Sequence, residues 1–313
     1  MNSKPAYCSK FNLDSSETVA YNNPLFPAYI AYGFLSSYPD YSAISHWHRD
    51  LEFILIQRGA MTYNVDGELV ELTEGNGIMV NSRRLHYGFS AEHSECEFIC
   101  ILLSPELLQG NKWFYEHYIE QITGDPSCPY LYLDRNGWQA SILEKLEQIY
   151  RSCRAVSTEP SSASCCIAAA EPAYFELIEN FTFIMRVLYQ NFDRKDRVRT
   201  GEASGLASLR SMIAYMEEHY AEHLALADIA LSGACCKSRC SLLFKKYLHD
   251  TPVTWLTKLR LRKSLTALLE SDKSITDIAY EHGFGGASYY CETFKRYYGI
   301  PPLAYKRLAV RTL

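Results

Sequence analysis

Ile275-Thr-Asp-Ile-Ala279 lies near the C-terminus and is followed, fifteen residues after Ala279, by Phe294-Lys-Arg296. The arrangement also occurs about fifty residues earlier, where Leu226-Ala-Asp-Ile-Ala230 precedes Phe244-Lys-Lys246. Each copy predicts a short helix, a tight turn and a second helix with a basic end, which is the pattern of a helix-turn-helix. One such unit places a helix in a DNA major groove, and two could reach successive grooves. The repeat therefore predicts sequence-specific DNA binding.

The second copy carries the clearer turn and end signals. Ala279 is small enough for two helices to cross closely, and Gly283 stands where the turn needs positive φ. The second helix should start near Gly286 and run to Tyr298, with Gly299 at its C-terminal cap. These signals predict both boundaries of the helix that would enter the groove.

The first copy departs from this pattern at four positions. Ala234 stands where the second copy has Gly283, and Cys236 where a Ser or Thr cap is expected. Cys240 takes the place of a usual Leu, and His249 occupies the cap position of Gly299. His tolerates positive φ better than most residues. We therefore expect the same fold with a less certain pattern of base contacts.

The exposed faces of the two second helices supply the candidate DNA-contacting residues. These are Lys237, Ser238, Arg239, Ser241, Lys245, Ala287, Ser288, Tyr289, Glu292 and Lys295. Each copy alone would also fit an ordinary helical hairpin with a basic edge. The repeat and the long basic helix expected over Pro252 to Leu269 favour DNA binding.

Other basic residues are expected to play supporting parts. Lys246, Arg262, Lys263 and Arg296 fit phosphate contacts or solvated charges better than base readers. Arg260 lies near the apolar stripe of the same long helix, and an internal ion pair with Asp277 is the preferred interpretation.

Charge is distributed unevenly along the 313 residues. The chain carries a net charge of −5, but residues 201–313 carry +4 and residues 1–200 carry −9. A local basic excess on an acidic protein fits a DNA reader whose other half has a different task.

Residues 28–104 predict a sheet-rich domain. Short apolar runs are separated by turn residues, and Asp66-Gly67 between two of them is a hairpin signal. The expected strands are Ala28–Leu35, Glu52–Ile56, Met61–Val65, Glu68–Leu72, Ile78–Val80 and Glu97–Leu103. Many short strands with frequent turns favour a β-barrel or a double-sheet roll.

From Pro105 to Phe192 the pattern becomes helical. The stripes Trp138–Ile149 and Tyr174–Leu188 predict two helices, which we expect to form a two-fold dimer interface; the alternative is that they cover the barrel. A Ser/Pro-rich loop is expected at 157–163 and an interdomain linker at 194–205. The predicted domains are 1–195, for effector binding and dimerisation, and 206–313, for DNA binding.

Residues 206–307 resemble the DNA-binding domain of the AraC/XylS family of bacterial transcription regulators. The residues that carry this resemblance are Trp255-Leu256, Leu259-Arg260-Leu261, Leu268-Leu269, Ser274 to Ala279, Gly283-Phe284, Ser288-Tyr289, Phe294-Lys295 and Gly299 to Pro302. Glu292 departs from the family, since many relatives have a basic residue there. The resemblance implies an α+β protein with an N-terminal cupin-like β-barrel, following helices, and a C-terminal all-α domain of two helix-turn-helix units.

One set of polar residues in the expected barrel has the spacing H-x-H-x3-E. It comprises His46, His48 and Glu52, and His86 follows in a later segment. His46 and His48 should point the same way on a strand, and barrel closure should bring all four together. The set resembles the metal ligands of the cupin fold, so Fe, Mn, Ni or Zn is one alternative. Because related sensor domains often bind a small molecule without metal, we expect effector binding here, with Tyr63 as a stacking surface and no cofactor.

The expected function is a transcription regulator, not an enzyme, controlled by a small molecule, with a sugar or related metabolite favoured. Double-stranded promoter DNA, RNA polymerase for an activator, and a second copy of the chain are the expected partners. The alternative is a cupin metalloenzyme fused to a DNA-binding domain.

The remaining composition indicates a cytoplasmic protein. No apolar stretch is long enough to span a membrane, and the N-terminus lacks an apolar signal core. The eleven cysteines form no CxxC pair and should be reduced, mostly buried thiols. Redox sensing through Cys235, Cys236 and Cys240 is the alternative.

Overall fold

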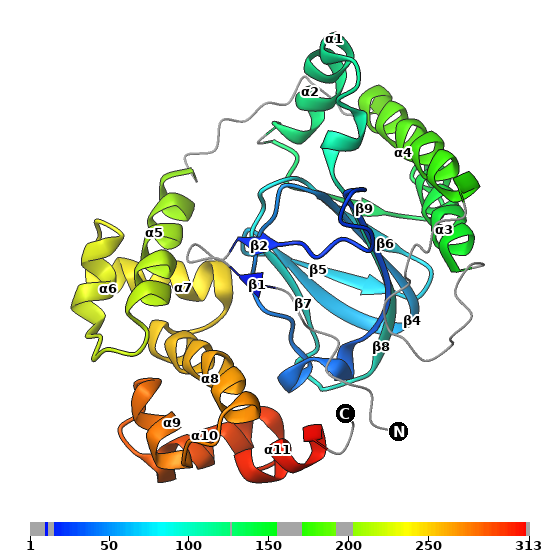
Figure 1. Cartoon of the computed structure of the whole chain (residues 1–313). Coiled ribbons are helices and arrows are strands. Elements are labelled where there is room, and N and C mark those ends of the chain that lie inside the picture. Colours follow the sequence, from blue (N-terminus) through cyan, green and yellow to red (C-terminus); the bar gives the residue numbers. More distant parts are fainter. Residues whose placement is uncertain (1–9, 12–15, 126, 155–170, 192–202, 311–313) are drawn as a thin grey trace. The chain divides into compact units, whose positions relative to one another are not determined.

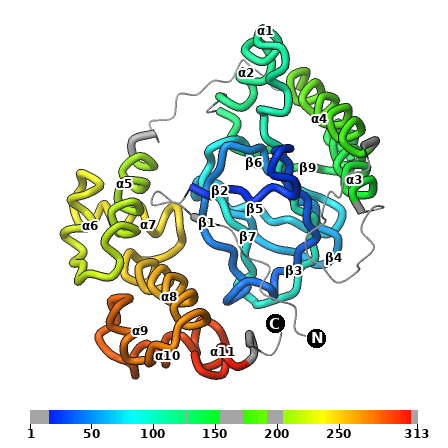
Figure 2. Tube along the Cα trace, in the orientation of Figure 1, coloured from blue at the N-terminus to red at the C-terminus, as the bar shows by residue number. Residues whose placement is uncertain are grey.

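The computed structural model describes residues 10–11, 16–125, 127–154, 171–191 and 203–310, which divide into two compact units (Figures 1 and 2). Residues 17–191 of this set belong to the first unit and residues 203–310 to the second. The predicted loop 157–163 lies outside the described residues, as does the predicted linker except for residues 203–205, which begin a helix. In the described part of the chain, no helix is both long and apolar enough to cross a membrane.

The first unit is built on a seven-stranded sheet whose paired strands are antiparallel. Its strands are β3 (Ala28–Phe34), β4 (Leu51–Val65), β5 (Glu68–Thr73), β6 (Gly77–Val80), β7 (His86–Phe89), β8 (Cys96–Leu103) and β9 (Tyr130–Leu133). The hydrogen-bonded order is β3-β8-β4-β6-β9, and β5 and β7 also pair with β4. Strands β1 (Lys10–Phe11) and β2 (Glu17–Thr18) form a separate two-stranded sheet.

The expected fold class is confirmed, but the sheet does not close into the predicted barrel. In the described part of the chain, the hydrogen-bonded path begins at β3 and ends at β9 without joining them. The unit has two separate cores. One lies between the sheet and the helices that follow it, and the other lies between the two halves of the bent sheet.

Strand β4 merges two of the predicted strands and bends between them. Its first half pairs with β6 and β8, and its second half pairs with β5 and β7. A register shift falls between Ile56 and Arg58, and Gly59 has a φ of +79°. A Cβ at Gly59 would lie 2.5 Å from the carbonyl oxygen of Glu95. Glycine is therefore needed where the strand turns from one half of the sheet to the other.

The prediction that residues 105–192 are helical is wrong at β9, and β7 was also not predicted. Both are four-residue strands, and β9 reads Tyr-Leu-Tyr-Leu, an apolar run too short for periodicity to separate a strand from a helix. The other elements of this part are short helices in two connections of the sheet, from β3 to β4 and from β8 to β9. They are η1 (Leu35–Ser37), η2 (Pro39–Tyr41), η3 (Pro105–Leu108), α1 (Lys112–Phe114), η4 (Tyr115–Ile119) and α2 (Glu120–Thr123).

Helices α3 (Ala140–Arg154) and α4 (Glu171–Asn191) lie side by side against the sheet (Figure 1). Leu177, Phe181 and Leu188 of α4 are at most 1% exposed and pack in the core with Phe53 of β4. Most of the apolar stripe that suggested a dimer interface is thus used inside the unit. These residues pack against the sheet, as the alternative interpretation expected. Dimerisation through α3 and α4 stays a prediction.

The second unit contains seven described helices. They are α5 (Ala203–His219), α6 (Leu226–Ser232), α7 (Lys237–Leu248), α8 (Pro252–Glu270), α9 (Ile275–Glu281), α10 (Ala287–Tyr298) and α11 (Pro302–Val310). The first helix-turn-helix is α6–α7 and the second is α9–α10, while α8 joins them and contacts helices of both (Figure 2). The predicted cap residues are confirmed, because His249 and Gly299 both have the left-handed conformation at φ +51° and +78°.

The prediction for Arg260 is wrong. Its guanidinium donates to the carbonyl oxygens of Tyr220 and Glu222, each at 2.7 Å, instead of pairing with Asp277. The reason is that carbonyl groups after the C-terminal end of α5 need donors, which a guanidinium can supply in a fork. Asp277 accepts instead from the hydroxyl of Ser274, the cap residue of α9, at 2.6 Å.

Arg262 and Lys263 are also engaged within the unit. The ammonium group of Lys263 lies 2.9 Å, and the guanidinium of Arg262 3.9 Å, from the carboxylate of Glu217, which is 3% exposed. A buried carboxylate needs such partners to offset its desolvation. These two basic residues therefore neutralise Glu217, a part that the sequence interpretation as phosphate contacts or solvated charges did not foresee.

Substitution of Gly283 by alanine should destabilise the second unit by about 2–4 kcal/mol, from left-handed strain plus overpacking. Gly283 has a φ of +77°, and a Cβ there would lie 2.8 Å from both the Ala221 carbonyl oxygen and Nε of Arg260. Gly285→Ala is the matched control, since nothing lies within 4 Å of its Cβ position. Denaturant unfolding monitored by hydrogen exchange of α9 measures both, and equal stabilities would contradict the prediction.

Candidate nucleic-acid interface and ligand site

The second helix of each helix-turn-helix presents one exposed polar face. On α7 all five predicted residues are exposed, namely Lys237, Ser238, Arg239, Ser241 and Lys245. On α10 the exposed predicted residues are Ser288, Tyr289, Glu292 and Lys295, while Ala287 is half-buried. The opposite faces are buried, which leaves these residues free to meet a groove.

The buried faces are apolar and hold each pair of helices together. Tyr290 and Phe294 of α10 are 0% exposed and pack with Ile278 and Ala279 of α9. The Tyr290 hydroxyl meets the hydroxyl of Ser264 on α8 at 3.1 Å. On α7, Cys240 and Phe244 are likewise 0% exposed. The exposed polar face of each second helix is therefore held in place by a buried apolar face, as insertion into a DNA groove requires.

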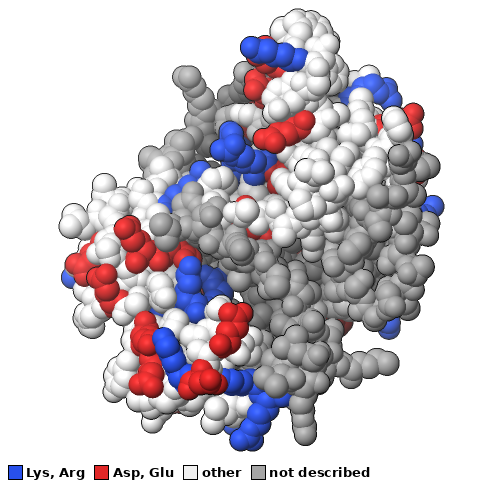
Figure 3. Space-filling model, viewed as in Figure 1, with Lys and Arg blue, Asp and Glu red and all other residues white. Residues whose placement is uncertain are grey.

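Exposed side chains that sequence reasoning missed lie on the same elements. Leu242 of α7 is 60% exposed, beside Ser241. An apolar side chain on such a face can contact a thymine methyl group, but an isolated Leu carries no signal for this in sequence. On the face shown in Figure 3, basic side chains of this unit stand among acidic ones rather than in one patch. The two helix faces, more than bulk charge, define the candidate interface.

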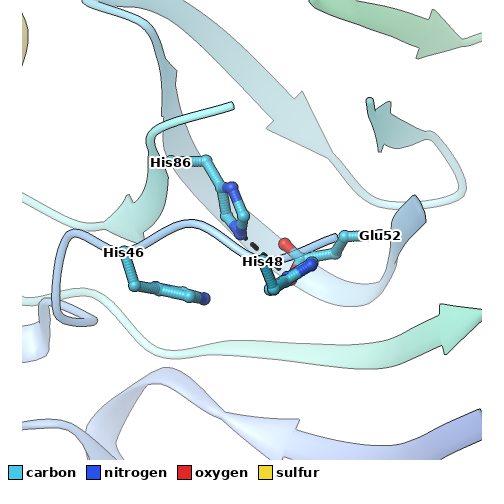
Figure 4. Close-up of side chains that lie close together, drawn as sticks. All are labelled: His46, His48, Glu52 and His86. Carbon is cyan, nitrogen blue, oxygen red and sulfur yellow. Dashed lines mark hydrogen bonds and ion pairs between the residues drawn. The ribbon is translucent and has the colours of Figure 1, made fainter. Parts of the chain in front are cut away.

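The first unit brings four predicted residues together in its interior. The ligand atoms of His46, His48, Glu52 and His86 all lie within 4.8 Å of one another, and each residue is at most 5% exposed (Figure 4). Glu52 is on β4 and His86 begins β7, while His46 and His48 precede β4. Backbone hydrogen bonds between His46 and His86, at 3.1 and 2.9 Å, hold these two segments in register.

Each of the three imidazoles places its Nδ1 atom beside a backbone carbonyl oxygen. Nδ1 of His46 lies 2.7 Å from the Ile44 carbonyl oxygen, and Nδ1 of His86 lies 2.8 Å from that of Arg84. Nδ1 of His48 lies 3.2 Å from the carbonyl oxygen of Asp50. Because a carbonyl oxygen only accepts, Nδ1 carries the proton in each ring, and Nε2 turns inward.

The Nε2 atom of each histidine lies close to a carboxylate group. Nε2 of His48 and Nε2 of His86 each lie 3.3 Å from Oε2 of Glu52, and Nε2 of His46 lies 3.2 Å from Glu17. The hydroxyl of Tyr63 donates to Oε1 of Glu52, the other carboxylate oxygen. Tyr63 was predicted as a stacking surface, and it does lie parallel to the His86 ring, with centroids 6.3 Å apart. Its nearest polar partner is nevertheless Glu52.

The charges in this cluster shift one another's protonation. Burial lowers the pKa of His46, but Glu17 and Glu52 outweigh burial and raise that pKa to about 9. Burial would raise the pKa of Glu52, yet His86 and His48 hold it well below its usual range. Burial lowers the pKa of His86 despite the opposing effect of Glu52. The pKa shifts thus favour a carboxylate at Glu52 and an imidazolium at His46.

Glu17 is the participant that sequence reasoning missed. It lies on β2, twenty-nine residues before His46, and no spacing pattern links the two. Cys100 of β8 is a second neighbour, since burial, followed by the charges of Glu52 and Glu17, raises the pKa of its thiol well above the usual value. Only pairing between distant strands brings these groups to the histidines.

Known family models match a stretch of each unit. Residues 31–159 match the family model described as the AraC-like ligand binding domain, and residues 234–308 match the helix-turn-helix domain. The chain belongs to the AraC family of transcription regulators. The first match contains the four clustered residues, and the second contains α7 and α10.

Relatives of this AraC-family chain include regulators of similar length. It is 26% identical over 273 residues to YdeC of Bacillus subtilis (strain 168), an uncharacterised HTH-type transcriptional regulator, covering 84% of this chain and 86% of that one. It is 33% identical over 109 residues to the HTH-type transcriptional activator RhaS of Citrobacter koseri, covering 35% and 39%. Among solved structures, ToxT of Vibrio cholerae O395 aligns over 90% of this chain and 96% of its own, at 13% identity and a TM-score of 0.39.

The cysteine prediction can also be assessed for the described residues. Cys96, Cys153 and Cys240 are buried, Cys100, Cys128, Cys235 and Cys291 are half-buried, and Cys236 is exposed; all are free thiols. Cys8, Cys165 and Cys166 lie outside the described residues. Among the described cysteines, half-buried and exposed thiols together outnumber the buried ones, so the expectation of mostly buried thiols is not met there, and their redox state stays a prediction.

Proposed function

We propose that this AraC-family regulator reads promoter DNA with α7 and α10 and receives its signal at the histidine cluster of the first unit. The proposed DNA recognition rests on one observation. Helices α7 and α10 each have an exposed polar face, and both helices contact α8 in the same unit. Two reading helices on one chain recognise two groove segments without requiring a dimer. The matched families give no support to the metalloenzyme alternative.

The exposed side chains of α7 and α10 suit different groups of the DNA, either base edges or phosphates. Arg239 can donate twice to guanine O6 and N7, and Glu292 can accept from cytosine N4. Lys237, Lys245 and Lys295 are exposed ammonium groups that suit phosphates. Ser238, Ser241, Ser288 and Tyr289 add hydroxyl contacts, while half-buried Ala287 permits close approach of the groove. Specificity is proposed to rest mainly on Arg239 and Glu292.

Replacement of Arg239 by alanine should alter sequence preference by about 1–3 kcal/mol at one base pair, because a bidentate contact is lost there. Lys245→Ala is the matched control on the same helix face, and it should weaken binding to all sequences alike and reduce the salt dependence. Affinities of the full chain for a regulated promoter and its single-base variants, at several salt concentrations, measure both. A uniform loss for Arg239→Ala would reassign that residue to phosphate contact.

The histidine cluster, which is the proposed effector site, has hydrogen-bonding groups next to apolar side chains. His46, His48, Glu52, Tyr63 and His86 supply donors and acceptors, and Ile54 and Ile56 of β4 are buried on the same side of the strand as Glu52. Sugar hydroxyls both donate and accept, so a sugar or related metabolite is the proposed effector. Its affinity must differ between two states of the protein, since otherwise binding could not change transcription.

The proposal extends to assembly and cellular partners. Phe175 of α4 is 78% exposed, next to the buried face, and could form part of a dimer contact through α3 and α4. A monomeric mass of the full chain at micromolar concentration would contradict the proposed dimer. The protein is proposed to act in the cytoplasm, and RNA polymerase is the further partner if it activates transcription.

A further inference from the structure

We propose that Arg260 is a positioning residue that fixes the distance and rotation between the two reading helices, α7 and α10. It thereby sets the spacing of the two DNA segments that the chain recognises. This inference rests on the proposed function, in which each of these helices enters a groove. One base pair more or less between the segments shifts the second segment by about 3.4 Å along the DNA axis and by about 35° around it. A rigidly joined pair of reading helices therefore accepts one spacing, whereas a loosely joined pair accepts several.

Helix α5 and the residues directly after it contact the turns of both helix-turn-helix units. A Cβ at Gly233, in the turn between α6 and α7, would lie 2.6 Å from Cγ of Met212 on α5. A Cβ at Gly283, in the turn between α9 and α10, would lie 2.8 Å from the carbonyl oxygen of Ala221. One continuous segment of chain thus touches both turns, in addition to the connection that α8 provides.

Arg260 of α8 lies at the second of these contacts. Its guanidinium donates to the carbonyl oxygens of Tyr220 and Glu222, each at 2.7 Å. Its Nε also lies 2.8 Å from the Cβ position of Gly283, so the planar group is placed against the turn that precedes α10. Burial lowers the pKa of Arg260, and Tyr289 of α10, one of the proposed DNA-contacting residues, opposes that shift. The end of α5, the middle of α8 and the second helix-turn-helix therefore meet at one side chain.

A second set of contacts holds α5 against α8 beside this junction. The carboxylate of Glu217, near the end of α5, lies 2.9 Å from the ammonium group of Lys263. The same ammonium group lies 5.8 Å from the ring centroid of Tyr220, and that ring lies 6.1 Å from the ring of His282 at the end of α9. Helix α7 packs on α5, so the orientation of α7 relative to α10 depends on how firmly this junction is closed.

The test measures the affinity of the full chain for a regulated promoter and for duplexes with one base pair inserted or removed between the two recognised segments. Wild-type protein should lose affinity by more than about tenfold at either altered spacing. Arg260→Lys keeps the positive charge but loses the planar fork of donors. This variant should bind the natural spacing about 3–10-fold less tightly than wild type, and the altered spacings within about threefold of the natural one.

Lys273→Ala is the matched control for the spacing experiment. It removes a basic side chain from the same unit, but Lys273 pairs with the exposed Glu281 and lies outside the junction. Its penalty for altered spacing should equal that of wild type. Base-pair insertion is informative because a merely structural loss of folded protein would weaken binding at all spacings alike.

A second measurement uses the full chain without DNA. In Arg260→Lys, amides of residues 283–286 should exchange hydrogen about tenfold faster than in wild type, since the turn loses its support. Amides of residues 231–236, at the first turn, should exchange as in wild type. The proposal is overturned if Arg260→Lys retains the wild-type penalty for altered spacing, or if both turns exchange at equal, changed or unchanged, rates relative to wild type. A wild-type chain that binds all spacings alike would overturn recognition of two groove segments, and this inference with it.

Discussion

Phe294→Ala should destabilise the second unit by about 3–5 kcal/mol, the usual cost of removing a buried phenyl ring. Phe294 is 0% exposed, and its ring lies 5.6 Å from that of Tyr290 and 4.4 Å from that of Tyr298. A cavity at this point would separate α10 from its support on α9. Hydrogen exchange of peptides covering residues 287–298 in the full chain measures the local free energy of unfolding.

Tyr280→Ala provides the matched control for this aromatic deletion. Tyr280 is on α9 in the same helix-turn-helix but is 61% exposed, so its loss should change stability by only about 0.5 kcal/mol. The expected difference between the two variants therefore reflects burial rather than loss of an aromatic ring. Equal protection of α10 in both would show that Phe294 does not hold the second reading helix.

His48→Ala should abolish the response of the regulated promoter to its effector while leaving promoter binding in the absence of effector unchanged. His48 is 3% exposed, and its Nε2 lies 3.3 Å from Glu52, so its removal breaks the centre of the proposed ligand site. Its segment belongs to the first unit, whereas both reading helices belong to the second. Transcript profiling of a deletion strain identifies the promoter, and a reporter then measures the response.

His93→Ala is the matched control for this experiment. It removes an imidazole from the same unit, but His93 is exposed, stacks on Tyr41 and lies outside the cluster. It should retain the response. A normal response in His48→Ala would place the effector site elsewhere.

The helix-turn-helix units could be predicted closely because their signals are local. Gly299 has no Cβ and adopts the left-handed conformation that ends α10, and Ser274 accepts from the backbone of its own helix at Asp277. The predicted second helix, from near Gly286 to Tyr298, differs from α10 by at most one residue at its start. Such caps act within one or two turns, so a single sequence reveals them.

The candidate ligand site was predictable only in part. His46, His48 and Glu52 are close in sequence, and His86 was joined to them through a resemblance to the cupin fold. The structure adds Glu17, and it gives Tyr63 a hydrogen bond to Glu52. It also shows that each Nδ1 faces a carbonyl oxygen, which determines the direction of the lone pairs. No spacing in the sequence carries that information.

By itself, then, the sequence determined the second helix of each helix-turn-helix, its C-terminal cap, the sheet-rich first half and the residue types of the cluster. Tertiary structure alone decided that β4 is one bent strand, that the sheet stays open, and that Arg260 holds the end of α5 instead of pairing with Asp277. The physical reason is the range of the forces concerned. Helix caps and turns are selected by the backbone preferences of adjacent residues, whereas strand pairing and burial of charge depend on which distant segments share the same core.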